Sequence, residues 1–291
     1  TYGNWLVETT DATVQLRVTK RGAAQLHRAP ADRTRDLAHD RTPPHLIAAD
    51  DPLFTTLGAG AAKRRQVDAF LRAVTGSLPE SDQLRVADLG CGNAYLTFAM
   101  YRYLVQRGRA AKVIGVDVRD DQRRRNTELA ATLDCAADMR FLAAGIAEAD
   151  LGDIDVALAL HACDTATDDA LARGVKAGAA RIFAAPCCHH DIAAQLKEST
   201  APAPYEALTT DGILRERFAD VLTDTVRALL LRMHGYHVDV VEFIDSAHTP
   251  RNTLIRARRT RTAPHPRYRA EYEALVAQWN VRPALARLLS V

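Results

Sequence analysis

The sequence lacks any long apolar run. No stretch reaches the roughly 18 consecutive apolar residues of a transmembrane helix, so no membrane partner is predicted. Its five cysteines have no regular spacing, which argues against a disulfide framework and favours a reducing, cytoplasmic location. The formal net charge of +2 is too small to indicate nucleic-acid binding by itself. With 47% apolar residues over 291 positions, the chain can form one large α/β domain with an appendage, or two small domains.

Residues 86–92 (Val-Ala-Asp-Leu-Gly-Cys-Gly) join the end of an apolar segment to a glycine-rich turn. A helical pattern follows, carried by apolar residues at i, i+3, i+4, i+7 and i+8: Leu96, Ala99, Met100, Tyr103 and Leu104. A strand, a turn and a helix in this order predict a ligand cradle, because glycines permit close backbone approach and a helix N-terminus offers unpaired N–H groups. The turn has neither the G-x-G-x-x-G spacing of dinucleotide-binding proteins nor the G-K-[ST] of a phosphate loop.

A second apolar segment, residues 113–117, also ends in a carboxylate, Asp117. Together with the glycine turn, it resembles the first two motifs of class I S-adenosylmethionine (SAM) methyltransferases. The resemblance implies a Rossmann-like, doubly wound seven-stranded α/β sheet, SAM as the cofactor, and a carboxylate at Asp117 that holds the ribose hydroxyls. The cofactor-binding residues that it implies are Asp88, Gly90, Cys91, Gly92, Asp117, Val118, Ile146, Leu160 and His161.

Three regions are predicted along the chain. Residues 1–50 form a small β-containing N-terminal module with strands near 5–7 and 14–18, residues 51–260 form the SAM-binding domain, and residues 261–291 form a helical tail docked on it. Within the domain, a helix is predicted over residues 63–74, and further strands over 139–142, 153–160, 180–185, 238–244 and 252–258. Another long helix is defined by Phe218, Val221, Leu222, Leu229 and Met233.

Three further motifs narrow the resemblance. They are Lys63-x-x-Gln66, Leu160-His161-x-Cys163 and Cys187-Cys188-His189-His190. In combination, over residues 45–258, they resemble the branch that includes the tRNA 2′-O-methyltransferases with a Cys-Cys-His-His motif and related methyltransferase-like domains. That branch implies RNA, and specifically tRNA ribose, as the acceptor. This chain departs from it in having Asp164 where those enzymes tend to have glycine, and in lacking their Cys/His zinc-binding N-terminal region.

A ribose hydroxyl is a poor nucleophile near neutral pH and needs a general base or a cationic neighbour. Many 2′-O-methyltransferases resemble one another in a Lys-Asp-Lys-Glu tetrad. The corresponding slots here hold Lys63, Asp164 (or Asp168), His189 or His190, and Glu242. The catalytic hypothesis is that Lys63 and Asp164 orient the nucleophile while His189 or His190 accepts its proton, since histidine titrates near pH 6.5.

Two other chemistries fit the same segments. Cys163 and Cys187 follow neighbouring predicted strands, and a thiolate there could activate a pyrimidine for C5 methylation by covalent attack. Zinc is the second, but four consecutive residues at 187–190 cannot readily surround one tetrahedral ion. Structural cysteines before a helix start are therefore expected, and no metal site is predicted. Exocyclic amine methylation is disfavoured because no Asn/Asp-Pro-Pro-Tyr follows the fourth strand.

Two basic segments favour RNA as the acceptor. Residues 17–41 hold seven basic residues against three acids, and residues 256–269 hold six arginines and no acid, interleaved with Tyr268. Each segment could equally be a solvated surface. Two alternatives therefore stay open, a small-molecule O- or N-methyltransferase and a non-catalytic SAM-binding protein. The sequence predicts no oligomeric state.

Overall fold

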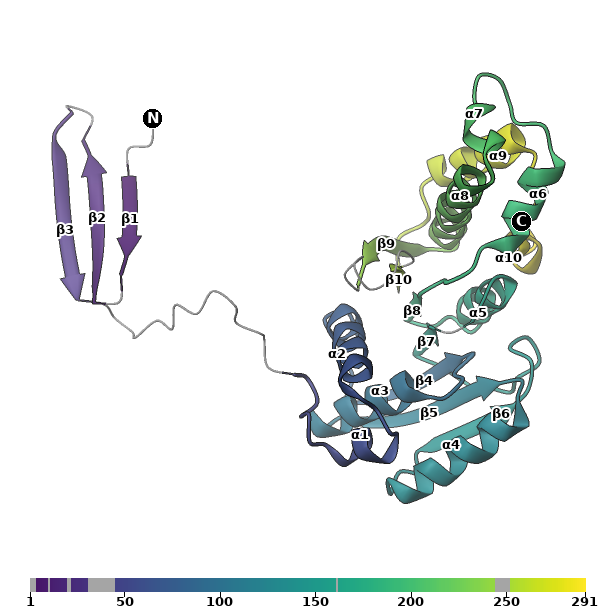
Figure 1. The fold of residues 1–291 in the computed structure, drawn as a ribbon, viewed down its shortest axis with the longest axis horizontal. Helices are drawn as coiled ribbons and strands as arrows, with labels where there is room; N and C mark the ends of the chain where they lie inside the picture. Colours follow the sequence, from purple (N-terminus) through teal and green to yellow (C-terminus); the bar gives the residue numbers. More distant parts are fainter. Residues whose placement is uncertain (1–3, 10, 20–21, 31–44, 161, 244–251) are drawn as a thin grey trace. The chain divides into compact units, whose positions relative to one another are not determined.

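Two compact units make up the chain in the computed structural model (Figure 1). They are Thr1–Pro44 and His45–Val291. The structure describes residues 4–9, 11–19, 22–30, 45–160, 162–243 and 252–291. The boundary predicted after residue 50 falls earlier here, because Ile47 is already buried in the core of the larger unit.

The smaller unit is an antiparallel sheet of three strands. These are β1 (Asn4–Glu8), β2 (Ala12–Val18) and β3 (Ala24–Pro30), paired in the order β1-β2-β3. The first two confirm the predicted β-containing module. The third was missed, because residues 24–30 lack the apolar alternation that marks a half-buried strand. Large apolar side chains of this sheet, among them Trp5 and Leu26, are exposed.

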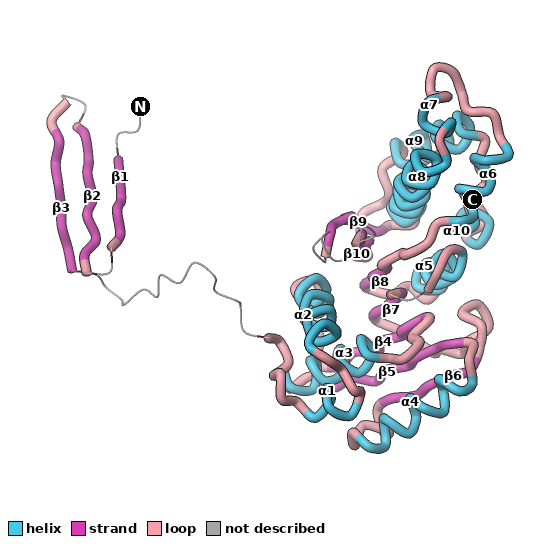
Figure 2. Tube along the Cα trace, viewed as in Figure 1, coloured by secondary structure: helices cyan, strands magenta, loops and turns pink. Residues whose placement is uncertain are grey.

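The larger unit contains a seven-stranded sheet covered by helices on both faces (Figure 2). Its strands are β4 (Gln83–Leu89), β5 (Ala110–Asp117), β6 (Met139–Ala143), β7 (Val156–Ala159), β8 (Arg181–Ala184), β9 (Tyr236–Glu242) and β10 (Thr253–Arg259). Its helices are α1 (Pro52–Thr56), α2 (Ala61–Thr75), α3 (Tyr95–Gln106), α4 (Asp120–Thr132), α5 (Thr165–Lys176), α6 (His190–Glu198), α7 (Ala207–Thr210), α8 (Gly212–Met233), α9 (Arg267–Trp279) and α10 (Ala284–Leu288).

The strand order is β6-β5-β4-β7-β8-β10-β9. Strands β4 to β8 are parallel, and β10 runs antiparallel to both of its neighbours. The chain moves outward from β4 through β5 to β6, then returns to β7 on the other side of β4. The order therefore reverses between β4 and β7, and the crevice beyond their carboxyl ends is where open α/β sheets bind ligands. This topology confirms the predicted doubly wound sheet.

Alternating side chains of β4 divide the core into two halves. Leu84 and Val86 pack with residues of α2 and α3, whereas Ala87 and Leu89 pack on the opposite face with residues of α5, α6, α8, α9 and α10. A strand with both faces covered is expected to be apolar throughout, and β7 (Val-Ala-Leu-Ala) is buried at every position. The tail helices α9 and α10 lie against α8 and α5.

Two of the helices predicted from amphipathic spacing are confirmed as α2 and α3. Val67, Phe70, Leu71 and Val74 of α2 are all buried. In α8 the same reasoning fails for Val221, which is 65% exposed. The predicted strand over 238–244 is β9, whose continuation at Ile244 lies outside the described residues.

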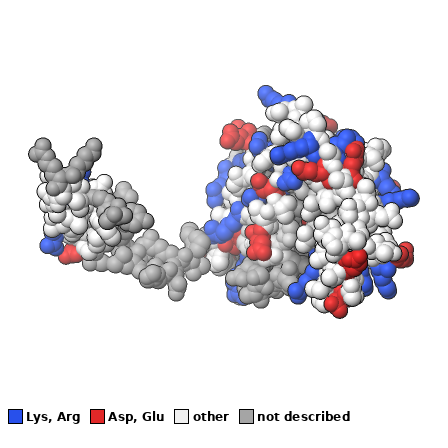
Figure 3. All heavy atoms as spheres, turned by 90° about the horizontal axis from the view of Figure 1, so that it is seen from above, with Lys and Arg blue, Asp and Glu red and all other residues white. Residues whose placement is uncertain are grey.

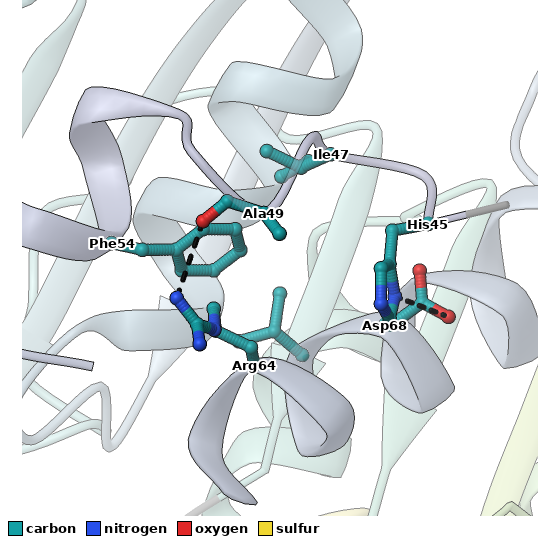
Figure 4. A pocket seen from close by; sticks show the side chains of 7 residues that line it. His45, Ile47, Ala49, Phe54, Arg64 and Asp68 are labelled. Carbon is teal, nitrogen blue, oxygen red and sulfur yellow. Dashed lines mark hydrogen bonds and ion pairs between the residues drawn. The ribbon is translucent and has the colours of Figure 1, made fainter. Parts of the chain in front are cut away.

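The segment that enters the larger unit is held on α2 (Figure 4). The Arg64 Nη1 atom donates to the carbonyl of Ala49 at 3.2 Å, and His45 Nδ1 lies 3.7 Å from the Asp68 carboxylate. None of the described helices has the length and apolarity needed to cross a bilayer.

Candidate cofactor and acceptor site

The glycine turn after β4 is held by the end of β5. The N–H groups of Gly90 and Cys91 both donate to the carbonyl of Val116, at 2.8 and 2.9 Å. Gly90 has φ +85°, a conformation that L-residues rarely adopt, and a Cβ there would lie 3.2 Å from Ala162. Glycine is required at this position both for the backbone angle and for the close approach of the loop that follows β7.

Asp117, at the end of β5, faces the same turn. Its carboxylate accepts hydrogen bonds from the Gly92 N–H at 3.0 Å, and from the Arg119 N–H and Nε, each at 3.0 Å. Burial acts to raise the pKa of this carboxyl, but the bonds from Arg119 and Gly92 outweigh it and lower the pKa. Asp117 is therefore an ionised acceptor beside the turn, with Arg119 as its present partner.

Asp88 lies beneath the turn and is 2% exposed. Thr97 donates to its Oδ2 atom, whereas Oδ1 is buried and has no hydrogen-bond partner among the described residues. Burial raises the pKa of this carboxyl to about 6, and the Asp117 charge adds to the effect. A buried acceptor without a partner is costly, so this oxygen marks a place where a ligand group or a water is expected.

The other predicted cofactor residues occupy different environments. Val118 follows Asp117 and is 73% exposed, an apolar side chain beside the turn. Ile146 is partly buried after β6, and Leu160 is buried at the end of β7. The Cys91 thiol points inward, because Gly115 leaves room for its Sγ, and burial raises its pKa. His161 lies outside the described residues.

These residues fit SAM. The turn offers close backbone approach at Gly90 and Gly92, Asp117 offers a carboxylate for two hydroxyls, and Val118 offers apolar surface for a purine. The unpartnered Oδ1 of Asp88 is a further acceptor at the same turn. Cys91 would contribute through its backbone, since its side chain is buried.

Lys63 lies in the first turn of α2, and its ammonium reaches the start of α3, which follows the glycine turn. Its Nζ donates to Gln66 at 2.9 Å and sits 4.8 Å from the centre of the Tyr95 ring, where Tyr95 is the first residue of α3. Burial lowers its pKa. The partner that a lysine beside an apolar helix face requires is thus supplied by Gln66 and Tyr95.

The Asp164 side chain caps α6. Its Oδ1 accepts from the Asp191 N–H at 3.1 Å, which ties the loop after β7 to the start of α6. Its φ is +53°, a conformation that favours glycine and is strained for aspartate.

His189 is buried and clamped by two carboxylates of α8. Its Nδ1 lies 3.0 Å from Asp220 Oδ1, and its Nε2 lies 3.0 Å from Asp224 Oδ1. As a proton acceptor it would have to give up one of these partners. His190, the first residue of α6, is exposed and carries no such constraint.

Arg227 continues this network into the core. It forms a two-pronged ion pair with Asp168, at 2.9 and 2.8 Å, contacts Asp224 at 3.3 Å and donates to the Asp164 carbonyl at 2.9 Å. Asp168, the alternative to Asp164 in the tetrad hypothesis, is thus paired inside the protein. The sequence reasoning missed the network, although Asp220, Asp224 and Arg227 are spaced four and three residues apart, which places them on one helix face.

Three cysteines meet beyond β7 and β8. The Sγ atoms of Cys163 and Cys187 are 3.1 Å apart, those of Cys187 and Cys188 are 3.7 Å apart, and all three lie within 4.8 Å of one another. Burial and the two neighbouring thiols raise the pKa of Cys187 to about 12. A thiol with a raised pKa is a weak nucleophile, which is unfavourable for the covalent C5 chemistry considered above.

A groove of about 1020 Å³ opens beside this cluster. Pro186, Cys187 and His189 border it on one side, and α8, Val240 and Thr253 complete its lining. Because Thr253 begins β10, which is antiparallel to β8, the groove lies at the carboxyl edge of the parallel strands. Exposed apolar side chains of the groove, including Val221, alternate with charged ones such as Arg217.

The arginine-rich segment 256–269 lies away from this edge. Arg258 pairs in register with Arg181, the first residue of β8, so the segment leaves the sheet at the end where the parallel strands begin. Arg256 is engaged with Asp239 and the carbonyl of Ala73. Glu242, by contrast, pairs with Thr253 at the carboxyl edge. Residues 20, 21 and 31–41 of the other basic segment lie outside the described residues.

Comparisons with known proteins agree with this geometry. Residues 62–195 match the family described as a methyltransferase domain. No curated protein matches the chain. Similar solved structures are magnesium protoporphyrin IX methyltransferase from Synechocystis PCC 6803 (18% identity, 67% of this chain and 82% of that chain, TM-score 0.40), ribosomal protein L11 methylase from Lactobacillus delbrueckii subsp. bulgaricus (13%, 68% and 80%, 0.42) and geranyl diphosphate C-methyltransferase from Streptomyces coelicolor A3(2) (12%, 69% and 80%, 0.45).

The conclusion rests on the family match and the strand order, because the similar solved structures are only 12–18% identical to this chain. The matched residues run from α2 through β8 to α6 and contain the glycine turn, Asp117 and the three cysteines. Over residues 62–195 the chain matches a methyltransferase domain, and its sheet has a doubly wound, Rossmann-like strand order.

Proposed function

We propose that this chain methylates RNA, with a ribose 2′-hydroxyl as the acceptor group. The observation that carries the proposal is the groove at the carboxyl edge, which lies beside Cys187 and His189 and is large enough for a nucleotide. Its position beyond β8 is where an acceptor would meet a methyl donor held at β4 and β5.

SAM, when bound, supplies a methyl group on a sulfonium. On the protein side, Asp117 would accept hydrogen bonds from the ribose hydroxyls, which would replace those it now accepts from Arg119. Val118 would lie against the adenine, and Gly90 and Gly92 would admit the methionine moiety. The positive end of α3, just past the turn, favours a carboxylate at this place.

The groove provides contacts of the kind that a nucleotide needs. Arg217 and Arg232 line it and can pair with phosphates, while the exposed side chains of Ile213, Val221 and Val240 offer apolar surface against a base. The charge in the groove is mixed, because Glu216, Asp220 and Asp224 line it beside the two arginines. Basic and acidic side chains are also interspersed on the face drawn in Figure 3, so RNA would be held by individual arginine contacts in the groove.

The proton of the hydroxyl needs an acceptor. His190 is exposed beside the cysteine cluster and is available for this role, whereas His189 is held between Asp220 and Asp224. Lys63 of α2, whose pKa is lowered by burial, would supply a cation beside Tyr95, the first residue of α3. Asp164 would contribute indirectly, by holding α6 in position, since its carboxylate caps that helix.

The experiment measures tritium transfer from labelled SAM to total RNA and to a metabolite extract. Label is expected in RNA, and alkaline hydrolysis should leave it in dinucleotides, because a 2′-O-methyl group prevents cleavage of the adjoining phosphodiester. Arg217→Glu should reduce transfer at least tenfold, while Arg269→Glu, on the exposed face of α9, should not.

Other results would replace the proposal. Label in the metabolite extract alone would show a small-molecule methyltransferase. SAM binding by calorimetry without label in either fraction would show a cofactor-binding protein without this activity. Alkali-labile label in RNA would place the methyl group on a base.

A further inference from the structure

The thiols of Cys163, Cys187 and Cys188 come from two segments, one after β7 and one after β8. The loop after β7 is held by Thr167, whose hydroxyl donates to the Ala162 carbonyl at 2.7 Å. The same loop is tied to the start of α6 by the bond from the Asp191 N–H to Asp164. The segment with Cys187 and Cys188 joins β8 to α6, so both ends of the cluster are anchored.

We propose that Cys163, Cys187 and Cys188 hold one Zn²⁺ ion, with a fourth coordination position open. Three thiolates are the ligand set of a thiophilic cation. At a Zn–S distance of about 2.3 Å, the sulfurs of a tetrahedral site lie about 3.8 Å apart. The distances here, 3.1 and 3.7 Å with all three atoms within 4.8 Å, need to change by only about 1 Å or less.

The difficulty that consecutive residues cannot surround an ion does not apply to this set. Cys163 lies 24 positions before Cys187 and approaches from a different strand end. His189 is not the fourth ligand, because both of its ring nitrogens lie 3.0 Å from carboxylates of α8. A site with three protein ligands keeps one position for water or for an atom of a substrate.

The ion would have a path to the site. Cys163 is exposed, and Cys187 lines the groove described above. Binding would replace the thiol hydrogen bonds of the cluster and release protons, because the ligands must be thiolates.

The test is a titration of the fully reduced, full-length protein with Co²⁺. One ion per chain is expected, with thiolate-to-cobalt charge-transfer absorption and the visible bands of tetrahedral coordination, both lost when Zn²⁺ is added. Cys163→Ser and Cys188→Ser should each weaken binding by at least about 100-fold, since even groups that only position ligands change affinity 10–100-fold. Cys135→Ala, at a buried cysteine elsewhere in the fold, should bind the ion unchanged.

Three outcomes would overturn the proposal. They are the absence of a charge-transfer band in the reduced protein, an unchanged spectrum and affinity in Cys163→Ser, and a stoichiometry that Cys135→Ala lowers as much as Cys163→Ser does. Circular dichroism of each variant shows whether it is folded. Because Cys163 is exposed, Cys163→Ser can be tested even if Cys187→Ser does not fold.

Discussion

Two parts of the carboxyl edge differ in how completely their buried charged groups are hydrogen-bonded. At β4 and β5, Asp88 is buried with one oxygen that has no partner among the described residues, and Asp117 is paired by the exposed side chain of a neighbour, Arg119. Beyond β7 and β8, Arg227 makes hydrogen bonds through all three of its guanidinium nitrogens.

This difference in hydrogen bonding distinguishes a part of the edge that can bind a ligand from a part that stabilises the fold. Buried polar groups that are fully hydrogen-bonded fix a structure, whereas an incompletely paired group retains capacity for a ligand. The comparison predicts that changes beyond β7 and β8 are felt mainly in stability, and changes at β4 and β5 mainly in cofactor binding.

The largest effect is expected at Arg227. Arg227→Met leaves Asp168 and Asp224 buried without their cation, so the free energy of unfolding should fall by about 3–5 kcal/mol. Urea unfolding measures it. Arg269→Met removes an exposed pair with Glu273 and should cost at most ~1 kcal/mol. Equal losses in the two variants would mean that the network does not hold the fold.

Asp88 should make stability fall as pH rises. Its pKa is about 6 in the folded protein and 3.8 as the ordinary value, so between these values the folded state keeps a proton that the unfolded state has lost. The unfavourable contribution is absent below about pH 4 and complete above about pH 6, where it reaches about 3 kcal/mol. Asp88→Asn should remove this slope in urea unfolding at a series of pH values. A mutant with the wild-type slope would contradict the assignment.

Asp117→Ala should weaken SAM binding by 10- to 100-fold or more, because hydrogen bonds to a charged group contribute about 1.5–3 kcal/mol. Calorimetric titration measures the dissociation constant. The matched control is Asp120→Ala at the start of α4, whose carboxylate pairs with Arg123 and Arg124. If both variants bind SAM as the wild type does, the ribose contact is refuted.

The smallest expected effect is a difference in stability between two glycine variants, which distinguishes the cost of a left-handed backbone angle from the cost of steric crowding. Gly58 has φ +63° with open space around a Cβ, whereas Gly90 has φ +85° and Ala162 at 3.2 Å. Both alanine variants incur the left-handed backbone cost, and Gly90→Ala should lose about 1 kcal/mol more through overpacking. Denaturant unfolding of the pair gives the difference directly. Equal losses would show that Ala162 moves aside freely.

The parts of the site that the sequence predicted are local. The glycine turn, its two acids and the apolar face of α2 each depend on residues close together in the chain, so spacing alone identifies them. Val221 was misassigned because apolar spacing does not reveal that this side of α8 borders a groove.

The contacts that the sequence could not predict join distant segments. His189 meets Asp220 and Asp224 only because α6 and α8 pack together, and Cys163 meets Cys187 only because β7 and β8 are neighbours in the sheet. Residue types and strand ends were identified, but the direction of a side chain was not. Asp164 illustrates this, since its carboxylate accepts a hydrogen bond from the first turn of a helix, α6.

The contact between Gly90 and Ala162 has a mechanical consequence. There is no room for even a methyl group between Gly90 and Ala162, so the glycine turn and the loop that carries Cys163 cannot shift toward each other independently. A ligand bound at the glycine turn should therefore change the reactivity of the exposed Cys163 thiol, four residues beyond the end of β7.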